Sequence, residues 1–262
     1  MSISLAVTDS ATMLRRDLLH MRRYPSLTVM LMGQPILFLL LFVFVFGNTL
    51  GAGIAGAGGG RTDYLTYITP AILVMAVASV ALGTAVSVAM DMTQGIVARF
   101  RTMPIARVSV LAGHVGGALV QTALAVAVSI GMALLLGYRP DASFADWLGV
   151  VGIILLLALA MTWLTVALGV HADSVETASN TPMPLMLLPF LGSGFVPTDS
   201  MPAGVRWFAE YQPFTPVMET LRGLLAGNPS ANDALLAVGW CVAITVLSAV
   251  WAVRLYQRKV TG

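Results

Sequence analysis

Residues 147–170 read WLGVVGIILLLALAMTWLTVALGV, an apolar run without a charged side chain. Because an α-helix rises about 1.5 Å per residue, roughly 20 such residues cross the hydrocarbon core of a bilayer. The whole chain shares this character, with 58% hydrophobic and 10% charged residues among 262, whereas soluble domains carry about 25% charged residues. This composition excludes an aqueous enzyme or a nucleic-acid-binding domain and predicts an all-α polytopic membrane protein.

Six apolar segments are long enough to span a membrane. We expect six transmembrane helices in a single domain over residues 1–262, at approximately 27–50, 66–90, 108–137, 147–170, 180–197 and 233–253. The fifth segment contains Pro182, Pro184, Pro189 and the triplet Gly192-Ser193-Gly194. Proline removes a backbone donor and interrupts a helix, so we expect this segment to be broken or re-entrant.

The cationic residues predict the orientation. If the N-terminus is cytoplasmic, ten of the 14 arginine and lysine residues fall on the cytoplasmic side, as the positive-inside rule requires. The four on the outer side are Arg61, Arg139, Arg206 and Arg222. With six spans, both termini are then cytoplasmic. Apolar residues at helical spacing before the first span predict an N-terminal interfacial helix; the alternative is a charged flank that only sets the topology.

The segment 198–232 is expected to lie outside the membrane core, before the last span. Within it, Thr215 followed by Pro216 indicates a helix start, and Gly227 indicates its end. An apolar and aromatic piece, 203–211, precedes this helix. It carries Trp207 and Tyr211, residue types that favour the membrane interface.

Catalytic and metal-binding motifs are missing. A P-loop needs a lysine followed by serine or threonine, but the only lysine is Lys259, which Val260 follows. The three histidines stand apart and Cys241 is the only cysteine, so we expect neither a metal site nor a disulfide. The interiors of the predicted spans contain no Asp, Glu, Lys or Arg, and this absence argues against a proton- or sodium-coupled carrier.

The loop between the second and third spans is densely charged and reads DMTQGIVARFRTMPIAR over residues 91–107. Ile96, Phe100 and Met103 repeat at helical spacing beside Arg99 and Arg101. This pattern predicts a short amphipathic helix that presents an apolar ridge and cations to a soluble partner. The alternative is a loop that sets the topology and rests on lipid headgroups.

Several pieces of the chain resemble the type-2 permease family of ATP-binding-cassette (ABC) exporters, in particular the daunorubicin/doxorubicin resistance permeases. The matching pieces extend from about Leu14 to Gly227, and the charged loop is the most specific of them. They are Gln34-Pro35-Ile-Leu-Phe38 through Phe46-Gly47, Tyr64 through Pro70, Asp91-x3-Gly95-x3-Arg99-Phe-Arg101-x2-Pro104-x2-Arg107, Phe195 through Pro202, and Gln212-Pro213-x-Thr215-Pro216 leading to Leu221-Arg222.

The resemblance implies a six-span permease with an N-terminal interfacial helix, a cytoplasmic coupling helix and two re-entrant external helices before the last span. It implies a multi-pass subunit of a bacterial plasma-membrane exporter for multidrug efflux or antibiotic resistance. The chain would carry no cofactor and no catalytic site. It would pair with a second copy or a paralogous permease, surrounded by membrane lipids, and dock on a cytoplasmic ABC ATPase that binds ATP and Mg²⁺.

The family's coupling element maps onto the charged loop. Its residues here are Asp91, Gly95, Arg99, Phe100, Arg101, Pro104 and Arg107. Two positions depart from the family pattern. Ala98 stands where an acidic residue often precedes the loop arginine, and Ala71 stands where a glycine often follows the proline of the second span.

The expected substrate path is an apolar cleft at the dimer interface. Methionine and aromatic side chains suit varied hydrophobic ligands. The candidate lining residues are Gln34, Pro35, Phe38, Phe42, Met75, Met186 and Phe190. The alternative is that these side chains only face lipid or the core.

Hydrophobic drugs, antibiotics or lipid-like molecules are the expected substrates. Two other functions stay open at this point. One is a permease for a polysaccharide or glycolipid precursor, and the other is a membrane resistance or scaffold protein that transports nothing.

Overall fold

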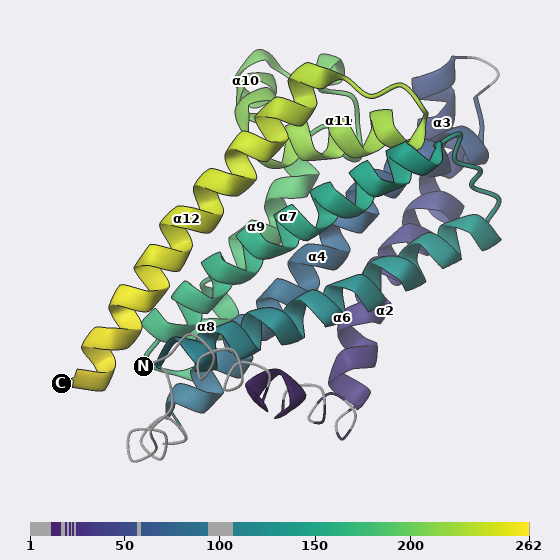
Figure 1. Ribbon diagram of the computed structural model, residues 1–262. Coiled ribbons are helices and arrows are strands. Elements are labelled where there is room, and N and C mark those ends of the chain that lie inside the picture. The colour runs from purple at the N-terminus through teal and green to yellow at the C-terminus, as the bar shows by residue number, and fades with distance from the viewer. Residues whose placement is uncertain are drawn as a thin grey trace.

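The computed structural model describes residues 12–16, 19, 21, 23, 25–56, 59–93 and 107–261. All the regular structure in these residues is helical, and none of them forms a β-strand. The all-α prediction is confirmed for this part of the chain. Figure 1 shows long helices packed side by side as a bundle, with some of the short helices at its upper end.

Five stretches are long and apolar enough to cross a membrane: Val29–Ile54, Arg61–Thr93, Val110–Leu135, Phe144–His171 and Ala231–Lys259. They match the predicted spans one to four and six. The first consists of α2 (Pro25–Leu41), the π-helical turn η1 (Phe42–Phe46) and α3 (Gly47–Ala55). The others are α4 (Arg61–Thr93), α6 (Arg107–Leu135), α7 (Phe144–His171) and α12 (Ala231–Thr261).

The fifth predicted span, 180–197, is not a continuous helix. It divides into the end of α8 (Val175–Asn180), α9 (Met183–Leu187), the 3-10 turn η2 (Leu188–Leu191) and a non-helical stretch before η3 (Thr198–Ser200). The break predicted from the prolines and glycines is confirmed. In Figure 1 α8 lies at the lower end of the bundle and α10 and α11 at the upper end, so this broken segment carries the chain between the two ends.

Helix α4 forms the centre of the bundle. The most apolar window of α4 is 78% buried inside the chain, compared with 17% for the first span and 22% for the last. A helix that is apolar on every side is stable where protein or lipid surrounds it, and α4 is surrounded mainly by other helices of this chain. The first and last spans therefore leave most of their surface for lipid or for another protein.

Two short helices lie at the upper end in Figure 1: α10 (Ala203–Tyr211) and α11 (Phe214–Leu225). The predicted start at Thr215 is wrong, because α11 begins at Phe214 and the Thr215 hydroxyl donates to the carbonyl of Ala209 at 2.5 Å. The predicted end is confirmed. Gly227 follows the helix with φ +67°, a left-handed conformation that favours glycine.

Close approach of α7 to α4 depends on Gly169. A Cβ placed there would stand 2.6 Å from the carbonyl oxygen of Ala85 and 3.2 Å from the Cβ of Val88. By contrast, Gly152 on the same helix is exposed and has no atom within 4 Å of such a Cβ. Of these two glycines, Gly169 is therefore the one at which a larger side chain would collide with a neighbouring helix.

We expect Gly169→Ala to lower the free energy of unfolding by about 1–3 kcal/mol, the usual scale for overpacking a core. The matched change Gly152→Ala should be neutral or slightly stabilising, because alanine favours helix without meeting a neighbour. Thermal unfolding of both variants in detergent measures the difference. Equal melting temperatures for the two variants would contradict this role of Gly169.

Candidate transport pathway and coupling end

The structure places three groups of side chains where a transporter could use them. One is a charged group at the base of α4, the second an aromatic group between the first span and the broken segment, and the third a polar group on α11. The first two contain residues predicted from the sequence.

Asp91 lies in the last turn of α4, next to the charged loop. Its Oδ2 accepts a hydrogen bond from the Arg16 guanidinium and lies 3.1 Å from Nε2 of His114 on α6. The side chains of Asp91 and His114 are only 13% and 4% exposed. A carboxylate with so little water needs cationic or donor partners close by, and here they come from two other segments.

The N-terminal turn, residues 12–16, rests on α6 beside this pair. A Cβ on Gly113 would stand 2.5 Å from the Cβ of Met13, and one on Gly116 would stand 3.3 Å from Cδ1 of Leu14. These glycines let the N-terminal turn approach α6 closely. Asp91 then holds the turn through Arg16, so it connects α4, α6 and the N-terminus.

The rest of the predicted coupling element is outside this group. Gly95, Arg99, Phe100, Arg101 and Pro104 lie outside the described residues, and Arg107 begins α6. Asp91 is the member whose contacts are visible, and they are internal to the chain. The role of the other six in docking stays a prediction.

We expect Asp91→Asn to loosen the N-terminal turn, because the loss of a charged hydrogen bond lowers stability by about 1.5–3 kcal/mol. Hydrogen–deuterium exchange at residues 12–16 should become faster, while the centre of α7 stays unchanged. Asp141→Asn is the matched control, because Asp141 is exposed at the far end of α6 and contacts Leu225 through its backbone amide. Unchanged exchange at residues 12–16 in Asp91→Asn would refute the tether.

Aromatic rings from the first span and the broken segment form the second group. Phe190 and Phe195 stack with their centroids 4.4 Å apart. Phe42 approaches Phe195 at 4.8 Å, and Phe38 meets Phe190 edge-on at 5.7 Å. Phe38 and Phe42 lie four residues apart, the spacing that puts two side chains on one helix face.

Gln34 extends the same face by one more turn. Its Nε2 lies 3.5 Å from the sulfur of Met186 on α9. The structure therefore brings five of the seven predicted path residues together, all of them partly exposed: Gln34, Phe38, Phe42, Met186 and Phe190.

The other two predicted path residues lie apart from this surface. Met75 is fully buried in α4, within the core, and Pro35 is buried on α2. The aromatic group also contains Phe195, which was not among the predicted path residues. The sequence signal was present, because Phe195 opens one of the pieces that carry the family resemblance.

A cavity of roughly 50 Å³ lies between α7, α9, α11 and α12. Ligand pockets usually enclose about 300–1,000 Å³, so this cavity is too small for a drug-sized molecule. Apolar side chains line it, including Leu157, Leu188 and Cys241. None of its lining residues belongs to the aromatic group, whose predicted path residues are partly exposed.

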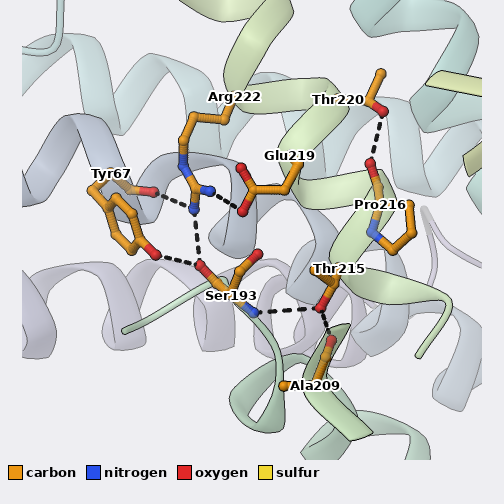
Figure 2. Close-up of polar contacts among 8 residues, drawn as sticks. All are labelled: Tyr67, Ser193, Ala209, Thr215, Pro216, Glu219, Thr220 and Arg222. Carbon is orange, nitrogen blue, oxygen red and sulfur yellow. Dashed lines mark hydrogen bonds and ion pairs between the residues drawn. The ribbon is translucent and has the colours of Figure 1, made fainter. Parts of the chain in front are cut away.

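The third group centres on Arg222 of α11 (Figure 2). Its Nη2 donates to the backbone carbonyl of Ser193 at 3.0 Å and to that of Tyr67 at 3.3 Å, and its Nη1 pairs with Glu219. The guanidinium also lies 4.0 Å from the centre of the Tyr67 ring, a stabilising cation–π distance. Arg222 thereby joins α11, α4 and the broken segment.

Side chains also satisfy the backbone of Ser193, which belongs to no helix. The Tyr67 hydroxyl donates to the Ser193 carbonyl at 2.6 Å, and the Ser193 amide donates to Oγ1 of Thr215 at 3.4 Å. Both contacts are drawn in Figure 2. Non-helical backbone at membrane depth persists only where it finds such partners within the protein.

The flanking glycines let the segment lie flat on its neighbours. A Cβ on Gly192 would stand 2.5 Å from Nε2 of Gln212, and one on Gly194 would stand 2.7 Å from the Cβ of Ala71. Ala71 is the position where the family often has glycine, and here its small side chain contacts the broken segment. Sequence reasoning missed the roles of Arg222 and Tyr67, although both lie in the matching pieces.

Taken together, these features are those of a multi-pass membrane protein of the permease class. Residues 9–226 match the model of the ABC-2 type transporter family. The chain belongs to this family, as the resemblance of its motifs implied.

Curated relatives support the same conclusion. The chain is 28% identical over 256 residues to a daunorubicin resistance ABC transporter permease of Streptomyces coeruleorubidus, covering 97% of this chain and 88% of that protein. It is 22% identical over 227 residues to a probable doxorubicin resistance ABC transporter permease of Mycobacterium tuberculosis, covering 87% and 80%. Membership of this family implies an ATPase partner on a separate subunit and pairing with a second permease.

Proposed function

We propose that this chain is the transmembrane permease subunit of an ABC exporter that moves hydrophobic drugs, antibiotics or lipid-like molecules out of the cell. A separate subunit hydrolyses the ATP and binds its Mg²⁺. The observation that carries the proposal is the partly exposed group of Gln34, Phe38, Phe42, Met186 and Phe190. The printed names of the relatives, which concern daunorubicin and doxorubicin resistance, favour drug-like substrates over sugar polymers.

In this proposal the aromatic group is one wall of the substrate path. A second permease, identical or paralogous, supplies the opposite wall. The neighbouring exposed apolar residues Leu37, Leu41, Met183 and Leu187 then contact that partner or lipid. Phenylalanine faces stack on flat apolar molecules, and Gln34 and Met186 provide adaptable contacts for varied ligands.

Coupling to ATP hydrolysis takes place at the end of the helix bundle opposite to α10 and α11. That end holds α8 (Figure 1) and the last turn of α4, which contains Asp91 and packs against α8, and the proposal places it in the cytoplasm. Arg99 and Arg101 offer bidentate cations to acidic groups on the ATPase, and Pro104 ends the coupling helix. Movement of this loop reaches the N-terminal turn and α6 through Asp91.

We expect Phe38→Ala to raise the concentration of an aromatic amphiphile that half-maximally stimulates ATP hydrolysis by the reconstituted complex. The shift should be about tenfold, because a lost aromatic contact is worth about 0.5–1.5 kcal/mol beyond its buried area. The control is Phe44→Ala, since Phe44 is 53% exposed and lies under Arg61 rather than in the aromatic group. Equal shifts in both variants would contradict the proposal that Phe38 lines the substrate path. Stimulation by a lipid-linked oligosaccharide instead would favour the polysaccharide alternative.

Arg101→Glu tests the coupling element. We expect the variant to insert into the membrane normally but to lose the ATPase during affinity purification in mild detergent. Coupled ATP hydrolysis should fall at least tenfold, because reversing the charge replaces attraction to the ATPase with repulsion. Arg139→Glu, in the turn between α6 and α7, is the charge-matched control and should retain the ATPase. Unchanged co-purification and hydrolysis in Arg101→Glu would overturn the docking role. Mass spectrometry of the same preparations shows whether the second permease is a copy or a paralogue.

A further inference from the structure

The polar group on α11 has no part in ATPase docking and does not line the aromatic surface. It nevertheless lies directly behind that surface. Ser193 is two residues before Phe195 and three after Phe190, so the backbone that Arg222 and Tyr67 hold is the backbone that carries the stacked pair of rings.

Two donors from different helices converge on a single acceptor, the Ser193 carbonyl. Arg222 Nη2 donates from α11 at 3.0 Å, and the Tyr67 hydroxyl donates from α4 at 2.6 Å. The Tyr64 hydroxyl adds a third contact from α4, to the carbonyl of Phe195 at 3.4 Å. Without these bonds the non-helical stretch would have little to fix it, because it has no helical hydrogen bonds of its own.

Three buried polar atoms around the same stretch have no hydrogen-bond partner among the described residues. They are Oγ of Ser193, Oε1 of Gln212 and Nε of Arg222. Unpaired buried groups are unfavourable and rare in stable packing. These three atoms can form further hydrogen bonds, with water or with other groups, when the segment shifts.

We propose that Arg222 and Tyr67 are positioning residues for transport: they hold the Ser193 carbonyl, and through it Phe190 and Phe195, in a closed arrangement that the ATP-driven cycle releases. This inference rests on the proposed exporter function, since release has a purpose only where a substrate passes the rings. The latch, defined as Arg222, Tyr67 and the Ser193 carbonyl, belongs to this chain alone and needs no residue of a partner.

The latch can be tested by measuring how accessible Ser193 is. Cys241→Ser removes the only cysteine, and Ser193→Cys then introduces a thiol in place of a hydroxyl that has no partner among the described residues. The permease–ATPase complex is placed in lipid nanodiscs, where both membrane faces are open to reagent. The rate of reaction with a water-soluble maleimide is measured without nucleotide and with ATP and Mg²⁺.

Tyr67→Phe removes one hydrogen bond and keeps the ring beneath Arg222. We expect it to raise the labelling rate without nucleotide by about fivefold, the scale of one hydrogen bond. Arg222→Lys, which keeps the charge but not the paired donors, should do the same. ATP should raise the rate in the parent and add little in either variant. Arg206→Lys is the matched control, since Arg206 pairs with Asp199 and Glu210 on the exposed side of α10, and it should label like the parent.

Two results would overturn the proposal. One is a parent labelling rate that ATP does not change in a complex that is shown to hydrolyse ATP. The other is a monodisperse Tyr67→Phe variant that labels at the parent rate. If Arg222→Lys does not fold, Tyr67→Phe still decides, because it deletes a single oxygen. Labelling without nucleotide requires neither substrate nor ATP hydrolysis, so failure of the latch is distinguishable from failure of the exporter function.

Discussion

Backbone hydrogen bonding in a medium without water is the constraint on which the rest of this structure depends. The five long spans meet it largely by themselves, because in their α-helical parts the backbone amides bond to carbonyls four residues earlier. The broken segment cannot, since prolines remove its donors and the stretch around Ser193 is not helical. Arg222, Tyr67 and Thr215 supply the missing partners from two other helices. A break in one element is thereby converted into a junction of three.

Helix α4 lies at the centre of these interactions. It contacts the first span, α6, α7 and α11, and it provides both Tyr67 for the latch and Asp91 for the charged group at its other end. One nearly fully buried helix therefore connects the aromatic surface with the end that we propose docks the ATPase. Close packing of such a helix, as at Gly169, makes it suited to transmit movement, because tightly packed interiors deform little.

Much of the fold could be predicted from the sequence because apolar length and proline position are local signals. Partners distant in sequence could not be predicted. Thr215 was expected to cap its own helix, but its hydroxyl found the Ala209 carbonyl instead. The partner of Asp91 is Arg16, 75 residues away. Gln34, Phe38 and Phe42 follow one another at the four-residue spacing of a helix face, whereas Met75 lies in a helix without a polar side to distinguish core from surface. The roles of Gly95 through Pro104 stay predictions.

The broken segment also has a consequence for biogenesis. Ser193 leaves the ribosome before Thr215 and Arg222, so for that interval its backbone has only the α4 side chains as partners. A stretch with unpaired backbone groups is unfavourable in hydrocarbon. The stretch around Ser193 therefore has its full set of hydrogen-bond partners only after α11 has been synthesised. The final conformation of this stretch therefore depends on a helix that follows it in the chain.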